Sequence, residues 1–492
     1  MKKALAFLLA VLLTVSVLFG CGSVDPSESE ATSVPSFDAE TTEETSQSDD
    51  PSGEPSEETT TPVSSEEPAS SEEPVSSEEP VSSEEPASSE EPVSSEEPVE
   101  TSSEEPQAEI GPAVIYITTS EKLNRKEYVS CTIRVVDPTG RFEEINDPEA
   151  TIKIRGNSTS VAPKSPYNIK FSSKEDLLGM GKCKKWYLLA NMFDKSQIRN
   201  KLAYDFAADI GLKYTQQSTF ADVYLNGKYR GCYQVCESIG VGESRVDIDT
   251  EDNEFLFEYE PWEQYSNENF MYTSVLRILL GFNDPEEPDS DQRAWLKDFF
   301  TKAENALLSY DKKEIAKYWD IDSFVDDYIV HEYFKCIDAQ TSSTRYYIKD
   351  GMIHGGPVWD FDLSSGNGSK EYYKSYYVDG DTTAGWWCRK GIWYKYFFKT
   401  DWFEQMVIDR FRELQPIIIN LAIDNELGKN KIDLLTEQYG ESFRKNYEER
   451  WNAAERNGPY ERDPLPTYEE NLTFLRNWLI KRNNWMKQQY GI

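Results

Sequence analysis

The sequence predicts an α+β fold in two lobes, with a β-rich N-terminal part and a helical C-terminal part. Three observations indicate this. β-branched, alternating segments are concentrated between residues 113 and 260. Apolar residues recur at helical spacing from Trp402 to the end. Residues 22–110 carry too little apolar surface to offset chain entropy, so the folded part begins near residue 111.

The N-terminus is typical of an exported lipoprotein. Lys2 and Lys3 precede an apolar run from Ala4 to Phe19, which is short for a membrane span and suits a signal-peptide core. A small residue, Gly20, then stands directly before Cys21. We expect residues 1–20 to be removed and Cys21 to be lipidated, which predicts an extracytoplasmic protein anchored in the bacterial cell membrane. The alternative is an ordinary signal peptide or an uncleaved anchor.

A linker of Ser, Thr, Glu, Pro and Asp follows, over residues 21–110. Its unit [AV]SSEEP occurs six times from Val63 to Pro98. Proline at every sixth position blocks helices and the paired glutamates repel one another, so we expect a disordered stalk. A β-solenoid also has a six-residue period, but a lone Ala or Val beside Pro supplies no packed interior.

Charge and composition exclude several classes of protein. The linker has 28 acidic residues and no Lys or Arg, which leaves 61 acids against 49 bases in residues 111–492. That mild acidity does not suit a nucleic-acid binder. His331 and His354 are the only histidines, which disfavours a zinc enzyme or a His-based hydrolase. Six cysteines after Cys21 allow 15 disulfide pairings: Cys131, Cys183, Cys232, Cys236, Cys336 and Cys388.

Secondary structure can be predicted along the folded part. Residues 263–330 are expected to be mostly helical and loop-like, and residues 344–363 to be β-rich. Asn226-Gly227 between two alternating segments is a strong hairpin signal. An amphipathic helix is expected over 197–210, and helices dominate after residue 402. The expected strands are 113–118, 130–136, 151–156, 167–171, 220–225, 229–235 and 255–260.

The first chemical motif is Arg155-Gly-Asn-Ser-Thr, followed by Lys164 and Lys170 in PKSPYNIKF. A glycine turn between strands exposes backbone N–H groups, and cations beside it suit phosphate. A loop with nearby lysines is the plainer interpretation. The second motif runs from Trp186 to Asn200, where the simplest interpretation is a helix capped by Ser196.

The third motif is the sharpest. Asp338 precedes an expected strand, and Asp360 and Asp362 follow it in Val-Trp-Asp-Phe-Asp. On an extended chain the last two carboxylates face the same way, which is unfavourable unless a cation lies between them. Oxygen ligands with almost no histidine favour Mg²⁺ or Mn²⁺ over zinc. The alternative is a solvated acidic turn.

These motifs in this order resemble one family, the spore coat protein H (CotH) kinases, atypical members of the protein-kinase-like group. The resemblance covers roughly residues 113 to 490. It includes RGNST, PKSPYNIKF, WYLLANMFDKSQIRN, VYLNGKYRGCYQVCESI and GPVWDFDLSSGN. It implies a kinase-like domain over 111–492, with a β-rich lobe to about 262 and a helical lobe beyond, binding ATP and Mg²⁺ between them.

The resemblance also implies roles for single residues. Lys170 or Lys164 is expected to bind the ATP phosphates, with Lys170 preferred because it lies on a strand. Glu237 is the candidate partner of that lysine. Asp338 is expected to orient the substrate hydroxyl, and Asp360 to hold the metal with Asp362 close by.

One position departs from the kinase pattern. Kinases place a metal-binding Asn five residues after the catalytic Asp, where this sequence has Ser343, and no Asn lies from 339 to 366. A Ser hydroxyl is a weaker metal ligand. We predict a surface-anchored kinase acting on Ser or Thr of extracytoplasmic proteins, including its own stalk. The alternatives are a pseudokinase that serves as a surface binding module, and an enzyme that transfers the nucleotide instead of phosphate.

Overall fold

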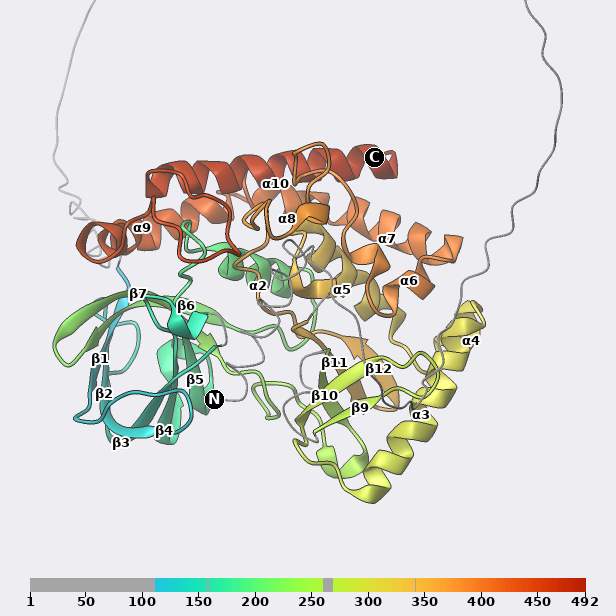
Figure 1. Cartoon of the computed structure of the whole chain (residues 1–492), viewed down its shortest axis with the longest axis horizontal. Helices are drawn as coiled ribbons and strands as arrows, with labels where there is room; N and C mark the ends of the chain where they lie inside the picture. Colours follow the sequence, from blue (N-terminus) through green and yellow to red (C-terminus); the bar gives the residue numbers. More distant parts are fainter. Residues whose placement is uncertain (1–110, 157–158, 260–268, 341) are drawn as a thin grey trace, which may run out of the picture. The chain divides into compact units, whose positions relative to one another are not determined.

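The computed structural model describes residues 111–492, apart from positions 157–158, 260–268 and 341. The expected signal peptide, the lipidation of Cys21 and the repeat linker lie outside the described residues. In the described part, strands dominate first and helices later, as the sequence predicts, so the fold class is α+β (Figure 1). The finer arrangement, two kinase-like lobes, stays a prediction.

The first seven strands close into a barrel in the order β1-β2-β3-β4-β5-β7-β6. Neighbours are antiparallel except β1 and β6, whose parallel pairing closes the ring. Alternate residues of each strand point inwards, and the interior is filled with fully buried apolar side chains such as Ile152, Ile169 and Trp186. The strands are β1 (Ala113–Thr118), β2 (Val129–Val136), β3 (Ile145–Ile154), β4 (Tyr167–Asp176), β5 (Lys182–Leu189), β6 (Ser218–Leu225) and β7 (Lys228–Glu237).

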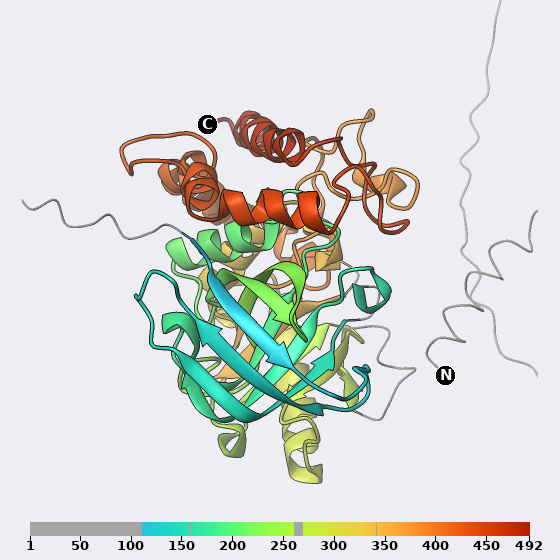
Figure 2. The ribbon, with the colours of Figure 1, turned by 90° about the vertical axis from the view of Figure 1, so that its left-hand side faces the viewer.

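The predicted hairpin is confirmed as β6 and β7. Asn226 and Gly227 form its two-residue turn with positive φ of 51° and 74°, the conformation that Asn-Gly favours. Helix α9 packs against this hairpin, where the rings of Phe443 and Phe220 lie 4.8 Å apart between centroids. Figure 2 shows α9 and α10, in orange and red, above the strands of the barrel.

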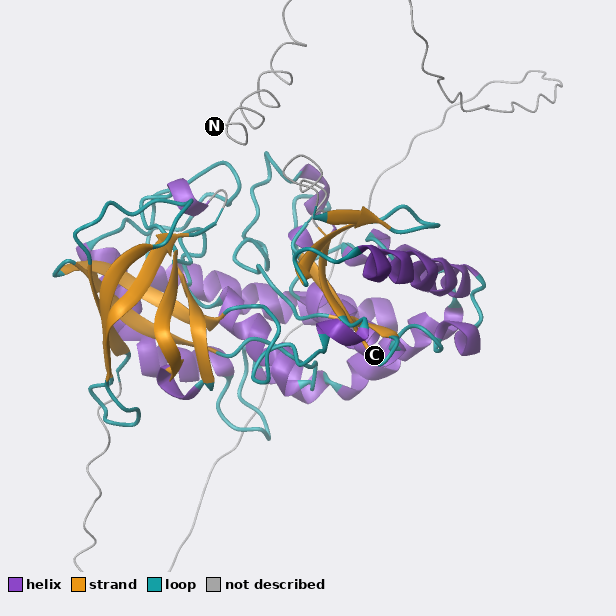
Figure 3. Ribbon diagram, turned by 90° about the horizontal axis from the view of Figure 1, so that it is seen from below, coloured by secondary structure: helices purple, strands orange, loops and turns teal. Residues whose placement is uncertain are grey.

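A second, five-stranded sheet has the order β12-β11-β8-β10-β9. Figure 3 shows it in orange, separate from the barrel. Two of its strands correct a prediction, because β9 and β10 lie in the segment expected to be helical and loop-like. β8 pairs with both β10 and β11, so the sheet extends across residue 262. Its strands are β8 (Phe255–Tyr259), β9 (Phe270–Tyr272), β10 (Leu279–Asp284), β11 (Thr344–Lys349) and β12 (Met352–Gly355).

The helices form one apolar core with this sheet. α3 and α10 both begin with capping boxes, made by Asp289 with Gln292 and by Thr467 with Glu470. No described helix is both long and apolar enough to cross a bilayer. The helices are α2 (Arg199–Asp209), α3 (Ser290–Leu308), α4 (Lys312–Ile315), α5 (Ile321–Tyr333), α6 (Tyr394–Phe397), α7 (Asp401–Glu413), α8 (Gln415–Asn420), α9 (Lys431–Glu449) and α10 (Tyr468–Tyr490).

Two local predictions need correction or completion. α2 begins at Arg199, and the oxygens of Asp194 accept hydrogen bonds from the backbone N–H groups of Ser196 (2.9 Å) and Arg199 (2.8 Å). The side chain that accepts hydrogen bonds at the start of α2 is therefore that of Asp194 and not that of Ser196. The chain makes two turns between Asn191 and Gln197 before the helix starts. The six cysteines of the described part are all free thiols, and five of them are buried.

Candidate active site

The segment containing Asp360 and Asp362 follows β12 and does not continue as a strand. Asp360 has a positive φ of 67°, so the expectation of two carboxylates on one side of an extended chain is wrong. Hydrogen bonds from Asn200 of α2 and from the nearby Asn367 hold this bend. Asn200 Oδ1 accepts from Phe361 N (2.7 Å), and Asn367 Nδ2 donates to Asp362 O (2.7 Å).

Three aspartates predicted from the sequence nevertheless come together. Burial raises the pKa of Asp362 well above its usual range, and the charges of Asp360, Asp338 and Asp194 raise it further. Burial also raises the pKa of Asp360, although Arg155 and Arg345 oppose that shift. We call Asp338, Asp360, Asp362 and Asp194 the acidic centre. Its members repel one another, which favours a bound cation.

Arg155 connects the barrel to the acidic centre. Its guanidinium lies over the rings of Tyr187 (4.1 Å to the centroid) and Trp359 (5.2 Å). Trp359 directly precedes Asp360 and stacks on Tyr204 of α2, at 6.0 Å between centroids. Arg155 therefore stands at the place where the barrel meets the bent segment, with its charge acting on Asp360.

The barrel surface beside Arg155 is basic. Residues that alternate with the buried Ile152, Ile169 and Trp186 point outwards, and they include Lys153, Lys170 and Lys185, which we call the cationic face. Lys170 lies directly opposite Lys185. Like charges in that position destabilise a sheet, and within the described residues these lysines form no ion pair. Arg155 continues the same outward alternation from β3, so the basic surface adjoins the acidic centre.

A comparison with known protein families identifies the family of this chain. Residues 152–486 match the family model described as CotH kinase protein. The chain belongs to the CotH kinase family. A search of curated proteins found no match. The CotH kinase match begins inside β3, so β1 and β2, which complete the barrel, precede it. It includes every residue from Arg155 to Asp362 that the sequence singled out.

Lys164, the other candidate for the phosphates in this CotH kinase family member, is buried away from the cationic face. Its Nζ donates to the carbonyl oxygen of Cys232 and lies over the ring of Tyr233, 4.6 Å from the centroid. Burial lowers its pKa to about 7. Lys164 therefore joins the strand β7 to the chain before β4, whereas Lys170 is exposed.

The expected pairing of Glu237 with Lys170 is contradicted. Glu237 lies opposite Trp186, whose neighbour in β4 is Ile169, so its side chain is on the inward side of the strands while Lys170 points outwards. Glu237 instead accepts hydrogen bonds from the guanidinium of Arg245 and from Gln217 N (2.8 Å). The alternation of side chains across the barrel decides this, because one residue of register moves a side chain to the other face.

The residues around Asp194 position the acidic centre, a role that sequence reasoning missed. Arg199 pairs with Asp194 and donates through Nε to Ser364 O (3.1 Å). Asn367 Nδ2 also donates to Phe193 O (3.0 Å). The motif that suggested a capped helix thus holds the segment that carries Asp360 and Asp362. The sequence signal that could have indicated this role is the number of polar residues between the apolar ones of the motif.

The donor set of the CotH kinase site suits a hard cation. Within the described residues, no three acidic, histidine or cysteine side chains are close enough to hold an ion by themselves. Mg²⁺ commonly takes one or two carboxylates and completes its shell with water and substrate phosphates, which fits Asp360 and Asp362. Ser343 has φ of 57°, and its carbonyl oxygen accepts from Arg345 Nη1 (3.3 Å). The role of Ser343 as a metal ligand stays a prediction.

Proposed function

We propose that this protein is an ATP-dependent kinase that phosphorylates Ser or Thr of extracytoplasmic proteins. The observation that supports it best is the meeting of the acidic centre and the cationic face at Arg155. Two adjoining sites of opposite charge suit a ligand that carries both signs. ATP with a divalent cation is such a ligand, and the family supplies the kinase chemistry.

Each group has a role in this proposal. Arg155, Lys170 and Lys185 bind the triphosphate, because they extend along one face of adjacent strands. Asp360 and Asp362 hold Mg²⁺ or Mn²⁺, which when bound neutralises charge on the phosphate oxygens. Asp338 stands at the start of a short turn before β11, within electrostatic reach of Asp362. It accepts the proton of the substrate hydroxyl.

The transfer balances without a further reactant. The hydroxyl oxygen of Ser or Thr forms a bond to the γ-phosphorus as the bond to the β–γ bridging oxygen breaks. The proton passes to Asp338, and ADP leaves with the bridging oxygen. The protein's contribution is to position both substrates and to place fixed charges against the charge that develops.

The leader and linker determine where this reaction occurs in our proposal. A lipid on Cys21 anchors the protein outside the bacterial cell membrane, and residues 22–110 form its stalk. The repeated Ser-Ser-Glu-Glu presents hydroxyl groups, and tethering gives them a high effective concentration at the domain. The stalk is therefore a candidate substrate. Phosphopeptide mapping of the reacted full-length protein tests this separately.

A second candidate function is a pseudokinase that binds a surface partner. Ser343 favours it, because this residue stands where kinases place a metal-binding Asn. Such a protein retains the nucleotide site and lacks transfer. The transfer of the nucleotide part of ATP to a protein is a related alternative, and mass spectrometry separates it from phosphorylation by the mass added.

The test combines nucleotide binding and transfer in the mature protein. With ATP and Mg²⁺ or Mn²⁺, we expect metal-dependent thermal stabilisation and phosphate incorporation into protein. Asp360→Asn should remove the stabilisation. Asp338→Asn should retain it and reduce transfer about 10²- to 10⁴-fold. Asp350→Asn is the matched control, because Asp350 is exposed and has a similar positive φ of 51°.

The possible outcomes separate the candidates. Stabilisation without transfer in the wild-type protein supports the pseudokinase. If ATP and metal stabilise neither the wild-type protein nor Asp338→Asn, both ATP-based candidates are wrong. Stabilisation that survives Asp360→Asn removes that residue from the metal site.

A further inference from the structure

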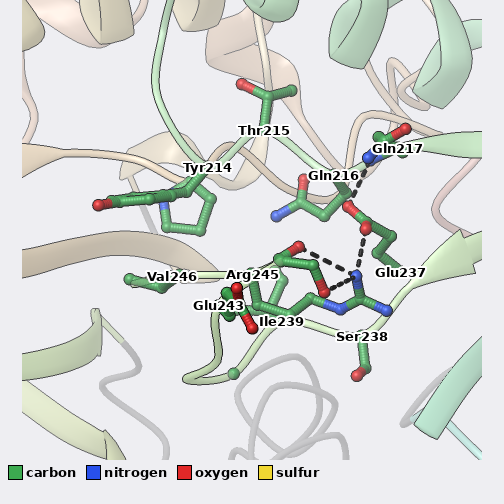
Figure 4. A pocket seen from close by; sticks show the side chains of 13 residues that line it. Tyr214, Thr215, Gln216, Gln217, Glu237, Ser238, Ile239, Glu243, Arg245 and Val246 are labelled. Carbon is green, nitrogen blue, oxygen red and sulfur yellow. Dashed lines mark hydrogen bonds and ion pairs between the residues drawn. The ribbon is translucent and has the colours of Figure 1, made fainter. Parts of the chain in front are cut away.

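A cavity of about 270 Å³ lies between two loops at one end of the barrel. One loop, residues 214–217, joins α2 to β6, and the other, residues 237–246, follows β7. Pro357 completes the lining. Figure 4 shows the side chain of Gln216 pointing into the space between Tyr214 and Arg245. None of these residues has a role in the kinase proposal.

The cavity contains polar groups without partners. Gln216 is only 5% exposed, and within the described chain neither its Nε2 nor its Oε1 makes a hydrogen bond. Arg245 is 9% exposed, and its Nε and Nη2 also lack partners, although Nη1 donates to Glu237 and Ser244 O. Buried donors and acceptors are nearly always satisfied in proteins. These groups are therefore available to a ligand that enters the cavity.

The unpaired groups define the chemistry of that ligand. Nε and Nη2 of Arg245 form the edge that binds a carboxylate with two hydrogen bonds. Gln216 offers N–H groups and one oxygen acceptor, so the ligand needs its own N–H donor as well. The pairing of Arg245 with Glu237 leaves no net positive charge in the cavity, and Glu243 is exposed at its lining. A ligand with both charges fits better than an anion.

We propose that this cavity is a binding site for a free α-amino acid, held by its carboxylate on Arg245 and by its ammonium group on the oxygen of Gln216. The cavity volume accommodates such a molecule. Glu237 keeps Arg245 oriented from the other side, and burial raises the pKa of Glu237 to about 7. This site does not depend on the proposed kinase function.

The position of the cavity connects it to the two charged regions. Pro357 belongs to the bent segment that leads to Asp360. Ser238 lines the cavity and donates through Oγ to the backbone oxygen of Lys185 (2.9 Å), a residue of the cationic face. The cavity therefore adjoins both the strand that carries Lys185 and the segment that leads to Asp360. The proposal itself concerns binding alone.

Saturation-transfer NMR on the mature protein with three probes of similar size tests the proposal. The probes are L-alanine, propionate, which lacks the ammonium group, and L-alaninamide, which lacks the carboxylate. We expect the strongest signal from L-alanine, a signal at least threefold weaker from propionate, and none from L-alaninamide. Gln216→Met and Arg245→Lys should each reduce L-alanine binding at least fivefold.

Gln489→Met is the matched control, because Gln489 is exposed on α10 and does not line the cavity. It should bind L-alanine like the wild-type protein. A melting temperature close to the wild-type value for either cavity variant shows that the loss is local. The proposal is overturned if none of the probes binds, which leaves water as the occupant. Equal binding of L-alanine and L-alaninamide, or unchanged binding in folded Gln216→Met, also overturns it.

Discussion

Two buried carboxylates of this protein, Glu332 and Asp362, have opposite surroundings. Glu332 pairs with Arg482 at 2.7 Å, and both side chains are fully buried. Glu332 also accepts hydrogen bonds from the backbone N–H groups of Trp387 (2.8 Å) and Cys388 (2.7 Å). Arg482 donates further to backbone oxygens. Asp362 has four acidic neighbours instead, Asp360, Asp338, Asp194 and Glu461, whose charges raise its pKa.

We interpret this contrast as one between a charge with a structural role, at Glu332, and charges that bind a ligand in the proposed function, around Asp362. A buried charge is tolerated when its partners belong to the same chain, as with Glu332. The acidic centre and the cationic face each hold like charges close together, although Arg199 pairs with Asp194 and the charges of Arg155 and Arg345 act on Asp360. The predictions below test this division, from the largest expected effect to the smallest.

The largest effect is expected from breaking the structural pair. Arg482→Met leaves Glu332 buried without its cation, which should lower the free energy of unfolding by about 3–5 kcal/mol. Urea denaturation at pH 7 measures it. Lys481→Met, at the exposed neighbouring position, should change the free energy by less than about 0.5 kcal/mol. Equal effects of the two variants would contradict a structural role for the pair.

A smaller effect is expected on the cationic face. Lys170→Met should weaken ATP binding about tenfold, or about 1.4 kcal/mol, because one phosphate contact is lost. The same change should relieve repulsion from Lys185 and leave the protein slightly more stable. Lys164→Met should leave ATP affinity within about twofold. Isothermal titration calorimetry with ATP and Mg²⁺ measures both, with Lys122→Met, at an exposed site between β1 and β2, as control.

The reverse result has a clear meaning for the two lysines. If Lys164→Met abolishes ATP binding in a folded protein and Lys170→Met does not, the phosphates bind at the buried lysine. The cationic face would then bind another anion, for which the acidic stalk is a candidate.

The smallest effect concerns pH. The pKa of Lys164 falls from its usual 10.5 to about 7 on burial, so between these values the unfolded chain binds more protons than the folded one. Stability therefore rises with pH, on the order of 1 kcal/mol between pH 7 and 8 for this residue. The loss of stability on lowering the pH is complete below about pH 7, where both the folded and the unfolded state bind the proton. Urea titrations at both pH values should show this rise, and Lys164→Met should reduce it.

Lys335 adds a similar dependence, because burial lowers its pKa to about 7 as well. Lys164→Met should therefore remove part of the rise and not all of it. A rise of unchanged size in Lys164→Met would show that Lys164 remains charged in the folded protein, held by the carbonyl oxygen of Cys232.

The candidate site residues could be picked out from the sequence because their signals are local. The spacing of Asp360 and Asp362, the strand after Asp338 and the outward alternation of Lys170 are all visible within a few residues. Asp194 escaped the prediction, since its charge acts on Asp362 from a residue 168 positions away in the chain. The partner of Glu237, Arg245, could not be predicted either, because the two side chains meet only through the folding of the loop after β7.

The sequence by itself determined the α+β class, the Asn226-Gly227 hairpin and the order of motifs that indicates the CotH kinase family. Each of these depends on periodicity, turn residues or spacing between neighbours in the chain. Only the tertiary structure decided the closure of the barrel by β1 and β6, the recruitment of β9 and β10 into the second sheet and the bend at Asp360. These features arise from pairing between distant segments, whose register and partners no local pattern records.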